Sequence, residues 1–129
     1  MAKPRMRISA AVLGAADANA LARFYEQLLG WTVVEAEPGW VRLRDPSGDA
    51  GSAGLSFAHE PDYVAPVWPT VAGGQQMMVH LDIAVEDLEA GVTRARELGA
   101  VLTEYQPQDH VRVMLDPAGH PFCLFRDSV

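Results

Sequence analysis

The chain has 129 residues, 49% hydrophobic and 21% charged, which is the composition of a globular protein rather than a disordered one. Its formal net charge of −7 argues against a nucleic-acid partner, because phosphate groups repel an acidic surface. No stretch approaches the roughly 18 apolar residues that cross a bilayer, and no signal peptide is recognisable. The single cysteine excludes an intrachain disulfide. We therefore expect a cytoplasmic protein without a membrane partner.

The first half predicts a strand, a helix and three further strands. Alternation indicates a strand at residues 8–13, and Leu21, Phe24 and Leu28 follow at helical spacing within residues 17–29. Asp17 suits the helix start, and Gly30 suits the left-handed conformation that ends a helix. Three strands then follow, at residues 32–36, 40–44 and 54–58.

The second half repeats this order after a segment rich in proline and glycine, residues 60–76. Alternation predicts a strand over residues 79–85, and helical spacing predicts a helix over residues 87–98 that ends at Gly99. Strands are expected at residues 101–104, 111–115 and 122–126. The connecting segment carries Tyr63, Val67 and Trp68, so we expect it to pack on a cavity mouth, a second subunit or the edge of a sheet.

Landmarks of the two halves recur about 70 residues apart. Asp17 is matched by Asp87, and the turn sequence Asp-Pro-Ser-Gly at 45–48 is matched by Asp-Pro-Ala-Gly at 116–119. The sequence therefore predicts an α+β protein with a single domain, residues 1–129, made of two βαβββ modules. Their expected bounds are residues 6–59 and 77–127, joined by the linker at 60–76.

Three stretches carry a family likeness: Asp17-x6-Phe24-Tyr25-x3-Leu29-Gly30-Trp31, then His80-Leu81-Asp82-x4-Asp87-Leu88-Glu89-Ala90, then Asp116-Pro117-Ala118-Gly119-His120-Pro121-Phe122-Cys123-Leu124. Together they resemble the vicinal oxygen chelate superfamily, which includes glyoxalase I, extradiol dioxygenases, fosfomycin-modifying enzymes and bleomycin-resistance proteins. The resemblance covers nearly the whole chain and is closest to short glyoxalase-like proteins. It implies two modules whose curled mixed sheets surround a shared small-molecule cavity, and it implies a homodimer, because relatives of this size usually pair.

The resemblance also implies where metal ligands would lie, on the first and last strands of each module. Those positions correspond here to Ala10, Ser56, His80 and Cys123. Alanine offers no donor atom, and a serine hydroxyl is a poor ligand for a divalent ion. His80 and Cys123 suit zinc, but a catalytic zinc usually keeps about three protein ligands. We therefore expect no metal cofactor; the alternative is an atypical divalent-metal site completed by another histidine.

His80 and Asp82 are the candidate catalytic residues, because two residues apart on a strand they share one face. A buried pair would let Asp82 orient the His80 ring as a general base. The alternative for His80 is a hydrogen-bonded core histidine, and for Cys123 it is a small buried hydrophobic residue. Trp40 and Trp68 are candidates to stack on a ligand, with core packing as their alternative.

Two classes of function follow from these residues. The first is a binding protein for a small molecule, cationic or aromatic, in which Ala10, Ser56, His80, Asp82, Cys123, Trp40 and Trp68 line the site. The second is a lyase or isomerase of the glyoxalase type that uses His80 or an atypical metal. A third hypothesis is an interaction module with an unused cavity. The simplest explanation for the negative net charge is that it keeps the protein soluble.

Overall fold

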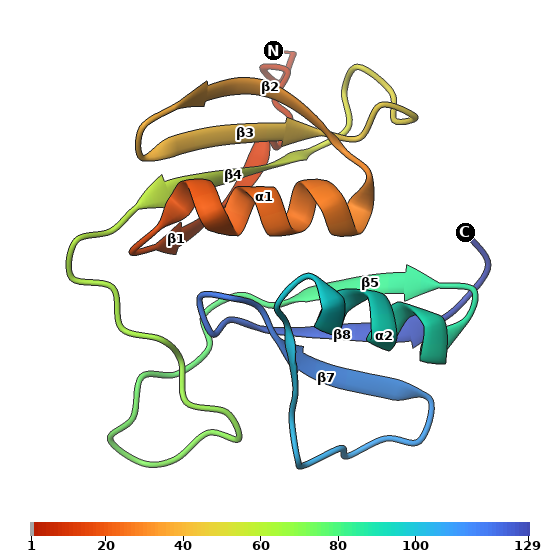
Figure 1. Ribbon diagram of the computed structural model, residues 1–129. Coiled ribbons are helices and arrows are strands. Elements are labelled where there is room, and N and C mark those ends of the chain that lie inside the picture. The colour runs from red at the N-terminus through yellow and green to blue at the C-terminus, as the bar shows by residue number, and fades with distance from the viewer. Residues whose placement is uncertain (1) are drawn as a thin grey trace. The chain divides into compact units, whose positions relative to one another are not determined.

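Each half of the chain folds as strand, helix and three strands, as the repeat predicts. The computed structural model describes residues 2–129 and divides them into two units, one up to Asp62 and one from Tyr63 onward (Figure 1). The first unit contains β1 (Ala10–Ala15), α1 (Ala18–Leu29), β2 (Thr32–Glu37), β3 (Trp40–Arg44) and β4 (Gly54–His59). The second contains β5 (Leu81–Val85), α2 (Leu88–Glu97), β6 (Val101–Leu102), β7 (Val111–Leu115) and β8 (Pro121–Arg126).

The first and last strands of each unit lie side by side and run parallel. The strand order is β1-β4-β3-β2 in one sheet and β5-β8-β7-β6 in the other. The remaining neighbours in both sheets are antiparallel, so both sheets are mixed, and neither closes into a barrel. The α+β class and the two βαβββ modules are therefore confirmed.

Helix α1 begins and ends where its capping residues predict. The Asp17 carboxylate accepts a hydrogen bond from the Ala20 backbone N–H at 3.0 Å, and Gly30 ends the helix at φ 69°. The buried face of α1 presents Leu21 and Tyr25 to the sheet, and the Tyr25 ring stacks on Phe57 of β4 at 5.7 Å. This contact places Phe57 on the helix-covered face.

Helix α2 is shorter and begins at the equivalent cap, with Asp87 accepting from the Ala90 N–H at 3.1 Å. Gly91 lets α2 approach its sheet closely, because a Cβ there would lie 3.2 Å from Val85 and 3.5 Å from Leu124.

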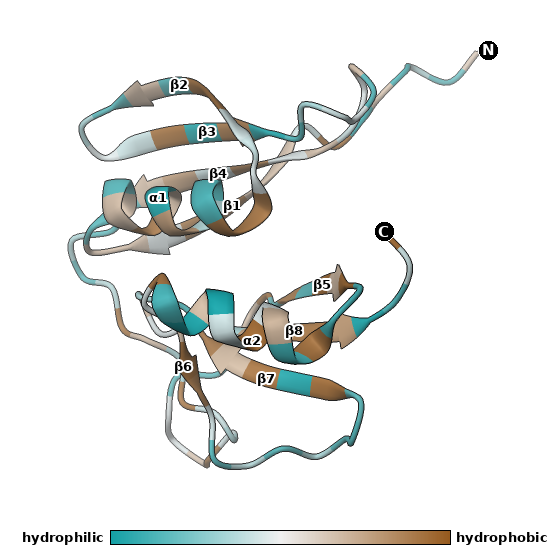
Figure 2. Ribbon diagram, turned by 45° about the vertical axis from the view of Figure 1, so that its right-hand side comes forward, coloured by the Kyte–Doolittle hydropathy of each residue, from teal (hydrophilic) through white to brown (hydrophobic). Residues whose placement is uncertain are grey.

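Both helices carry a mixture of hydrophilic and hydrophobic residues along their length (Figure 2). Among the residues described, no helix is long and apolar enough to cross a membrane.

The two Asp-Pro-x-Gly sequences form turns, each organised by its aspartate. Asp45 Oδ1 accepts from the Ser47 N–H and hydroxyl, and these hydrogen bonds lower the pKa of Asp45. Asp116 is 3% exposed, and its Oδ1 accepts from the N–H groups of Ala118 and His120 at 2.9 Å. His120 thus belongs to the second turn.

Several strand bounds differ from those expected. Strand β1 starts two residues late and leaves Ile8 76% exposed, because its partner β4 starts at Gly54, opposite Ala10. Strand β5 starts at Leu81, so His80 precedes the strand instead of lying within it. Strand β6 has only two residues, and beyond it the Val113 carbonyl accepts hydrogen bonds from the Thr103 hydroxyl and the Gln106 side-chain amide.

The proline-rich segment packs within the second unit. The Tyr63 hydroxyl donates to the Ala118 carbonyl at 2.8 Å, and burial together with the Asp116 charge raises the pKa of Tyr63 to about 12. The Trp68 ring lies 5.7 Å from the ring of Tyr105, which follows the edge strand β6. We expected this segment to pack on a cavity mouth, on a second subunit or on the edge of a sheet. The contact with Tyr105 agrees with packing on the edge of a sheet.

Replacing Asp17 by alanine should lower the free energy of unfolding by about 1 kcal/mol, because the first turn of α1 loses its N-cap hydrogen bond. Urea denaturation followed by circular dichroism measures this change. Asp49→Ala is the matched control, since this aspartate lies exposed in the loop between β3 and β4. Equal stability of the two variants would show that the cap contributes nothing.

Candidate functional site

Three potential ligand groups meet on the sheet of the second unit. Asp82 of β5 is paired in register with Cys123 of β8, so the two side chains share one face. That face lies opposite α2, because the alternate residues Val85 and Leu124 approach the helix. His80 precedes Asp82 by two residues, and the ligand atoms of all three lie within 4.8 Å of one another.

The His80–Asp82 pair forms as expected, but it is not buried. His80 Nε2 lies 3.2 Å from Asp82 Oδ1, while the two side chains are 41% and 61% exposed. The pair is exposed because His80 precedes the strand and Asp82 lies on the sheet face that the helix does not cover. The short distance still orients the ring, with Nε2 directed at the carboxylate.

Cys123 is a neutral thiol in this setting. Burial is the largest of the causes that raise the pKa of its thiol. The negative charge of Asp82 and a hydrogen bond with Asp82 raise this pKa further. A protonated thiol is a weak nucleophile. Cys123 is therefore a hydrogen-bonded, partly buried thiol in this structure.

The donor atoms of this cluster fit a metal better than the sequence indicated. The family positions supply only His80 and Cys123 in this unit, but Asp82 adds a carboxylate to make a nitrogen, oxygen and sulfur set. This set suits zinc, which binds imidazole, carboxylate and thiolate. Asp82 could have been counted from the sequence, since position i+2 on a strand shares the face of position i.

The first unit presents different chemistry at the equivalent positions. Val12 pairs with Ser56 in the same parallel arrangement in which Asp82 pairs with Cys123, so Ser56 corresponds to Cys123 by register. Ala10 and Val12 offer no donor atoms. Of the four positions implied by the family likeness, Ala10 supplies no side-chain donor and Ser56 only a neutral hydroxyl.

The two candidate tryptophans make contacts of their own within their units. Trp40 starts β3, and its ring Nε1 donates to Glu35 Oε1 at 2.7 Å. Trp68 and Tyr105 line a separate pocket with Pro69, Thr103 and Glu104. Neither ring belongs to the His80–Asp82–Cys123 cluster, so stacking on a ligand held there stays a prediction.

Each unit has the element order βαβββ, with one helix and with its first strand parallel to its last strand. Two such units define the class of glyoxalase-like proteins. The model of the glyoxalase-like domain family matches residues 10–125. The chain therefore belongs to the glyoxalase-like family, within the vicinal oxygen chelate superfamily.

Solved structures of similar fold share little sequence with it. A glyoxalase/bleomycin resistance protein/dioxygenase family enzyme from Burkholderia phytofirmans PsJN superposes with a TM-score of 0.68 at 18% identity, covering 94% of this chain and 98% of that one. A glyoxalase family protein from Enterococcus faecalis gives 0.64 at 22% identity, covering 92% and 96%. Lactoylglutathione lyase from Agrobacterium tumefaciens gives 0.59 at 20% identity, covering 96% of each chain. No curated protein matches significantly; these likenesses establish the fold.

Replacing Asp82 by asparagine should lower the pKa of Cys123, because the negative charge that opposes thiolate formation is removed. The thiol should then react faster with iodoacetamide near pH 8, which intact-protein mass spectrometry follows. Asp109→Asn, an exposed change in the same unit, should leave the rate at the wild-type value. A slower reaction in Asp82→Asn would contradict the assignment.

Proposed function

We propose that the protein binds a small molecule at the His80–Asp82–Cys123 cluster. The single observation that carries this proposal is the convergence of three polar side chains on an otherwise apolar sheet face. Strand register places Val113 opposite Cys123 on that face, and it places Ala84 opposite Phe125. An apolar surface with a few directed polar groups is typical of small-molecule sites.

The cluster favours a ligand with a donor or cationic group beside an apolar or aromatic part. The Asp82 carboxylate accepts hydrogen bonds, and the chain carries a net charge of −7 that attracts cations over longer distances. Phe125 offers an aromatic surface on the same face. Binding in this form needs no metal ion. A homodimer and a cytoplasmic location belong to the same proposal.

A ligand of this class should raise the thermal unfolding midpoint by mass action; a concentration of 100 times Kd adds about 2.7 kcal/mol. Differential scanning fluorimetry against cationic glycopeptides and aromatic metabolites measures the shift. Asp82→Asn should reduce it, because the carboxylate no longer attracts the cation. Glu86→Gln, which removes one exposed charge just after β5, is the matched control. The absence of a shift with every compound would favour an interaction module instead.

The second candidate is a lyase or isomerase, and the 3.2 Å His80–Asp82 distance favours it. Because His80 Nε2 faces the Asp82 carboxylate, the Nε2–H group would donate a hydrogen bond to that carboxylate. The other ring nitrogen, Nδ1, would then act as the general base and take a proton from a substrate carbon beside a carbonyl group. In the metal-dependent form, His80, Asp82 and Cys123 would instead hold zinc, which would supply polarisation of that carbonyl oxygen, and His80 would then be a ligand and not the base. His80→Ala should then abolish turnover while the circular dichroism spectrum stays unchanged.

Elemental analysis separates the metal-dependent form of this enzyme from the binding protein. Protein purified without added metal should hold well under one equivalent of transition metal if binding alone is the function. One equivalent of zinc per chain, lost in Asp82→Ala, would support the enzyme instead. Arg96→Ala, an exposed change on α2, controls for general effects of mutation on metal retention.

A further inference from the structure

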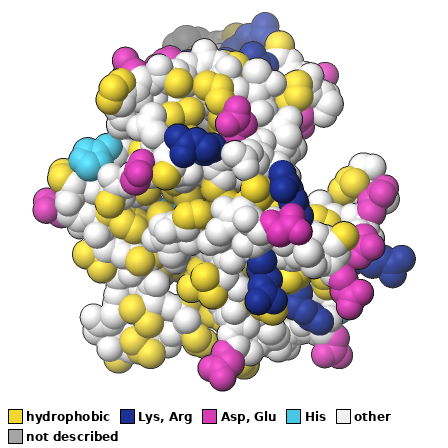
Figure 3. Space-filling view, viewed as in Figure 1, with side chains coloured by type: hydrophobic (Ala, Val, Ile, Leu, Met, Phe, Trp, Pro, Cys, Tyr) yellow, Lys and Arg dark blue, Asp and Glu magenta, His cyan; other side chains and the backbone are white. Residues whose placement is uncertain are grey.

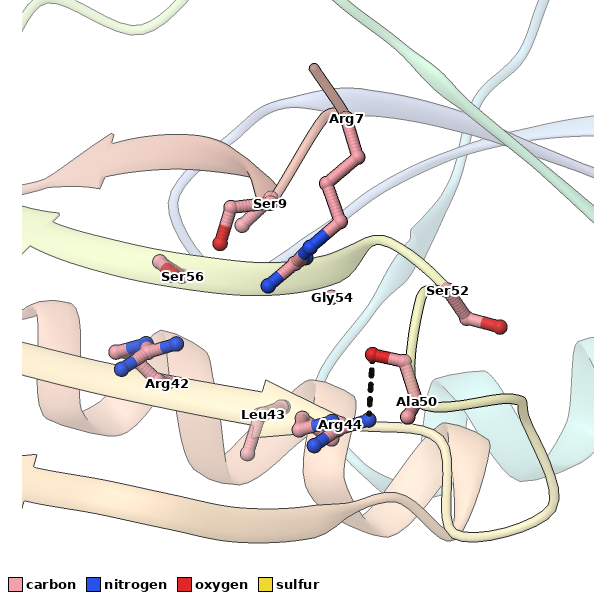
Figure 4. Close-up of a pocket in the computed structure, with 10 residues that line it drawn as sticks. Arg7, Ser9, Arg42, Leu43, Arg44, Ala50, Ser52, Gly54 and Ser56 are labelled. Carbon is pink, nitrogen blue, oxygen red and sulfur yellow. Dashed lines mark hydrogen bonds between the residues drawn. The ribbon is translucent and has the colours of Figure 1, made fainter. Parts of the chain in front are cut away.

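We propose that a pocket in the first unit binds a compact tetrahedral oxyanion, the phosphate group of a small molecule. The pocket has a volume of about 50 Å³ and lies beside β3 and β4 (Figure 4). That volume holds a few water molecules or one group of phosphate size. None of the cluster residues of the second unit lines it, so this inference is independent of the proposed function. The residues that carry it are Arg7, Ser9, Arg42, Arg44, Ser52 and Ser56.

The strand pattern brings the basic residues together. Arg42 and Arg44 alternate with Leu43 on β3 and share one face, while Leu43 is 1% exposed on the face toward α1. Arg7 reaches the same place from the segment before β1, with its guanidinium directed across β4 (Figure 4). Three guanidinium groups therefore line one small pocket from two separate segments.

The positive charge of this pocket is largely uncompensated. Arg42 has one carboxylate partner, Glu35, at 3.4 Å. Arg44 donates to the Ala50 carbonyl at 3.3 Å, and within residues 2–129 neither Arg44 nor Arg7 forms an ion pair. No Asp or Glu lines the pocket. Clustered like charges raise the free energy of the unliganded protein, and an anion removes that cost.

This arrangement is notable in an acidic chain. The protein has 17 acidic and 10 basic residues, and charged side chains of both signs are scattered over the face in Figure 3. Three of the ten basic residues nevertheless line one pocket. Net charge predicts a preference for cations, but the local charge at this site favours an anion.

Ser56 adds a hydroxyl donor to the pocket. Its residue is only 2% exposed, and its hydroxyl makes no hydrogen bond to any part of the chain that the structure describes. It nevertheless lines the pocket, next to Ser9 and Ser52. Among the described residues no fully buried side-chain oxygen lacks a partner, so this hydroxyl is open to the pocket and can donate its hydrogen bond to a ligand oxygen there.

Gly54 keeps the pocket open beneath these groups. A Cβ at this position would collide with the backbone oxygen of Leu43, so β3 and β4 lie too close for any side chain there. Gly54 therefore lines the pocket without a side chain, beside the arginine and serine side chains. Donors on several sides suit a tetrahedral anion with four oxygens better than a planar carboxylate.

Isothermal titration with inorganic phosphate, in a buffer without other oxyanions, tests this site. Wild-type protein should bind phosphate, whereas chloride at equal ionic strength should produce no heat of binding. The double variant Arg7→Gln/Arg44→Gln should weaken the Kd about tenfold or more, because two charge-assisted contacts are lost. Arg23→Gln, an exposed change on α1, is the control and should keep the wild-type Kd. An unchanged Kd in the double variant would overturn the proposal.

Ser56→Ala separates ligand binding from a structural role. Because the hydroxyl is unpartnered, its removal should leave the unfolding midpoint of the free protein unchanged or higher, while the phosphate Kd weakens several-fold. A lower midpoint with unchanged affinity would assign Ser56 to the fold and count against the site. Acetate in place of phosphate distinguishes the anion class: tighter binding of acetate would contradict a tetrahedral ligand.

Discussion

The parallel pairing of the first and last strands is the constraint on which both units depend. A parallel pair needs a crossover, and the crossover here includes the helix that covers one sheet face. The opposite face then carries the alternate residues of both strands. This pairing brings Asp82 beside Cys123 and Val12 beside Ser56, although about 40 residues separate the members of each pair.

The same frame supports two different surfaces. In the second unit the paired positions offer imidazole, carboxylate and thiol groups. In the first unit they offer apolar residues and a serine, and β3 adds Arg42 directly opposite Ser56. Because strand alternation decides which residues share a face, the two units differ in chemistry on that face while the core under each helix is apolar in both.

Much of the local structure could be predicted, because it depends on neighbours in the chain. Asp17 and Asp87 cap helices and Gly30 ends one, and the two aspartate turns form as their sequences indicate. The start of β1 was misplaced because a strand extends only as far as its partner, and no local pattern reports where β4 begins. The cationic pocket was missed for a related reason: Arg7 and Arg44 are far apart in sequence and give no local motif.

The sequence by itself determined the duplicated βαβββ order, the helix ends and the family, since all of these rest on short-range patterns that recur in each half. Only the tertiary structure decided which side chains meet. The addition of Asp82 to His80 and Cys123, the exposure of that cluster and the gathering of arginines around Ser56 all follow from strand register. Register is fixed when the hydrophobic face of each strand packs in the core and the turns close, and this brings together residues that are far apart in the sequence.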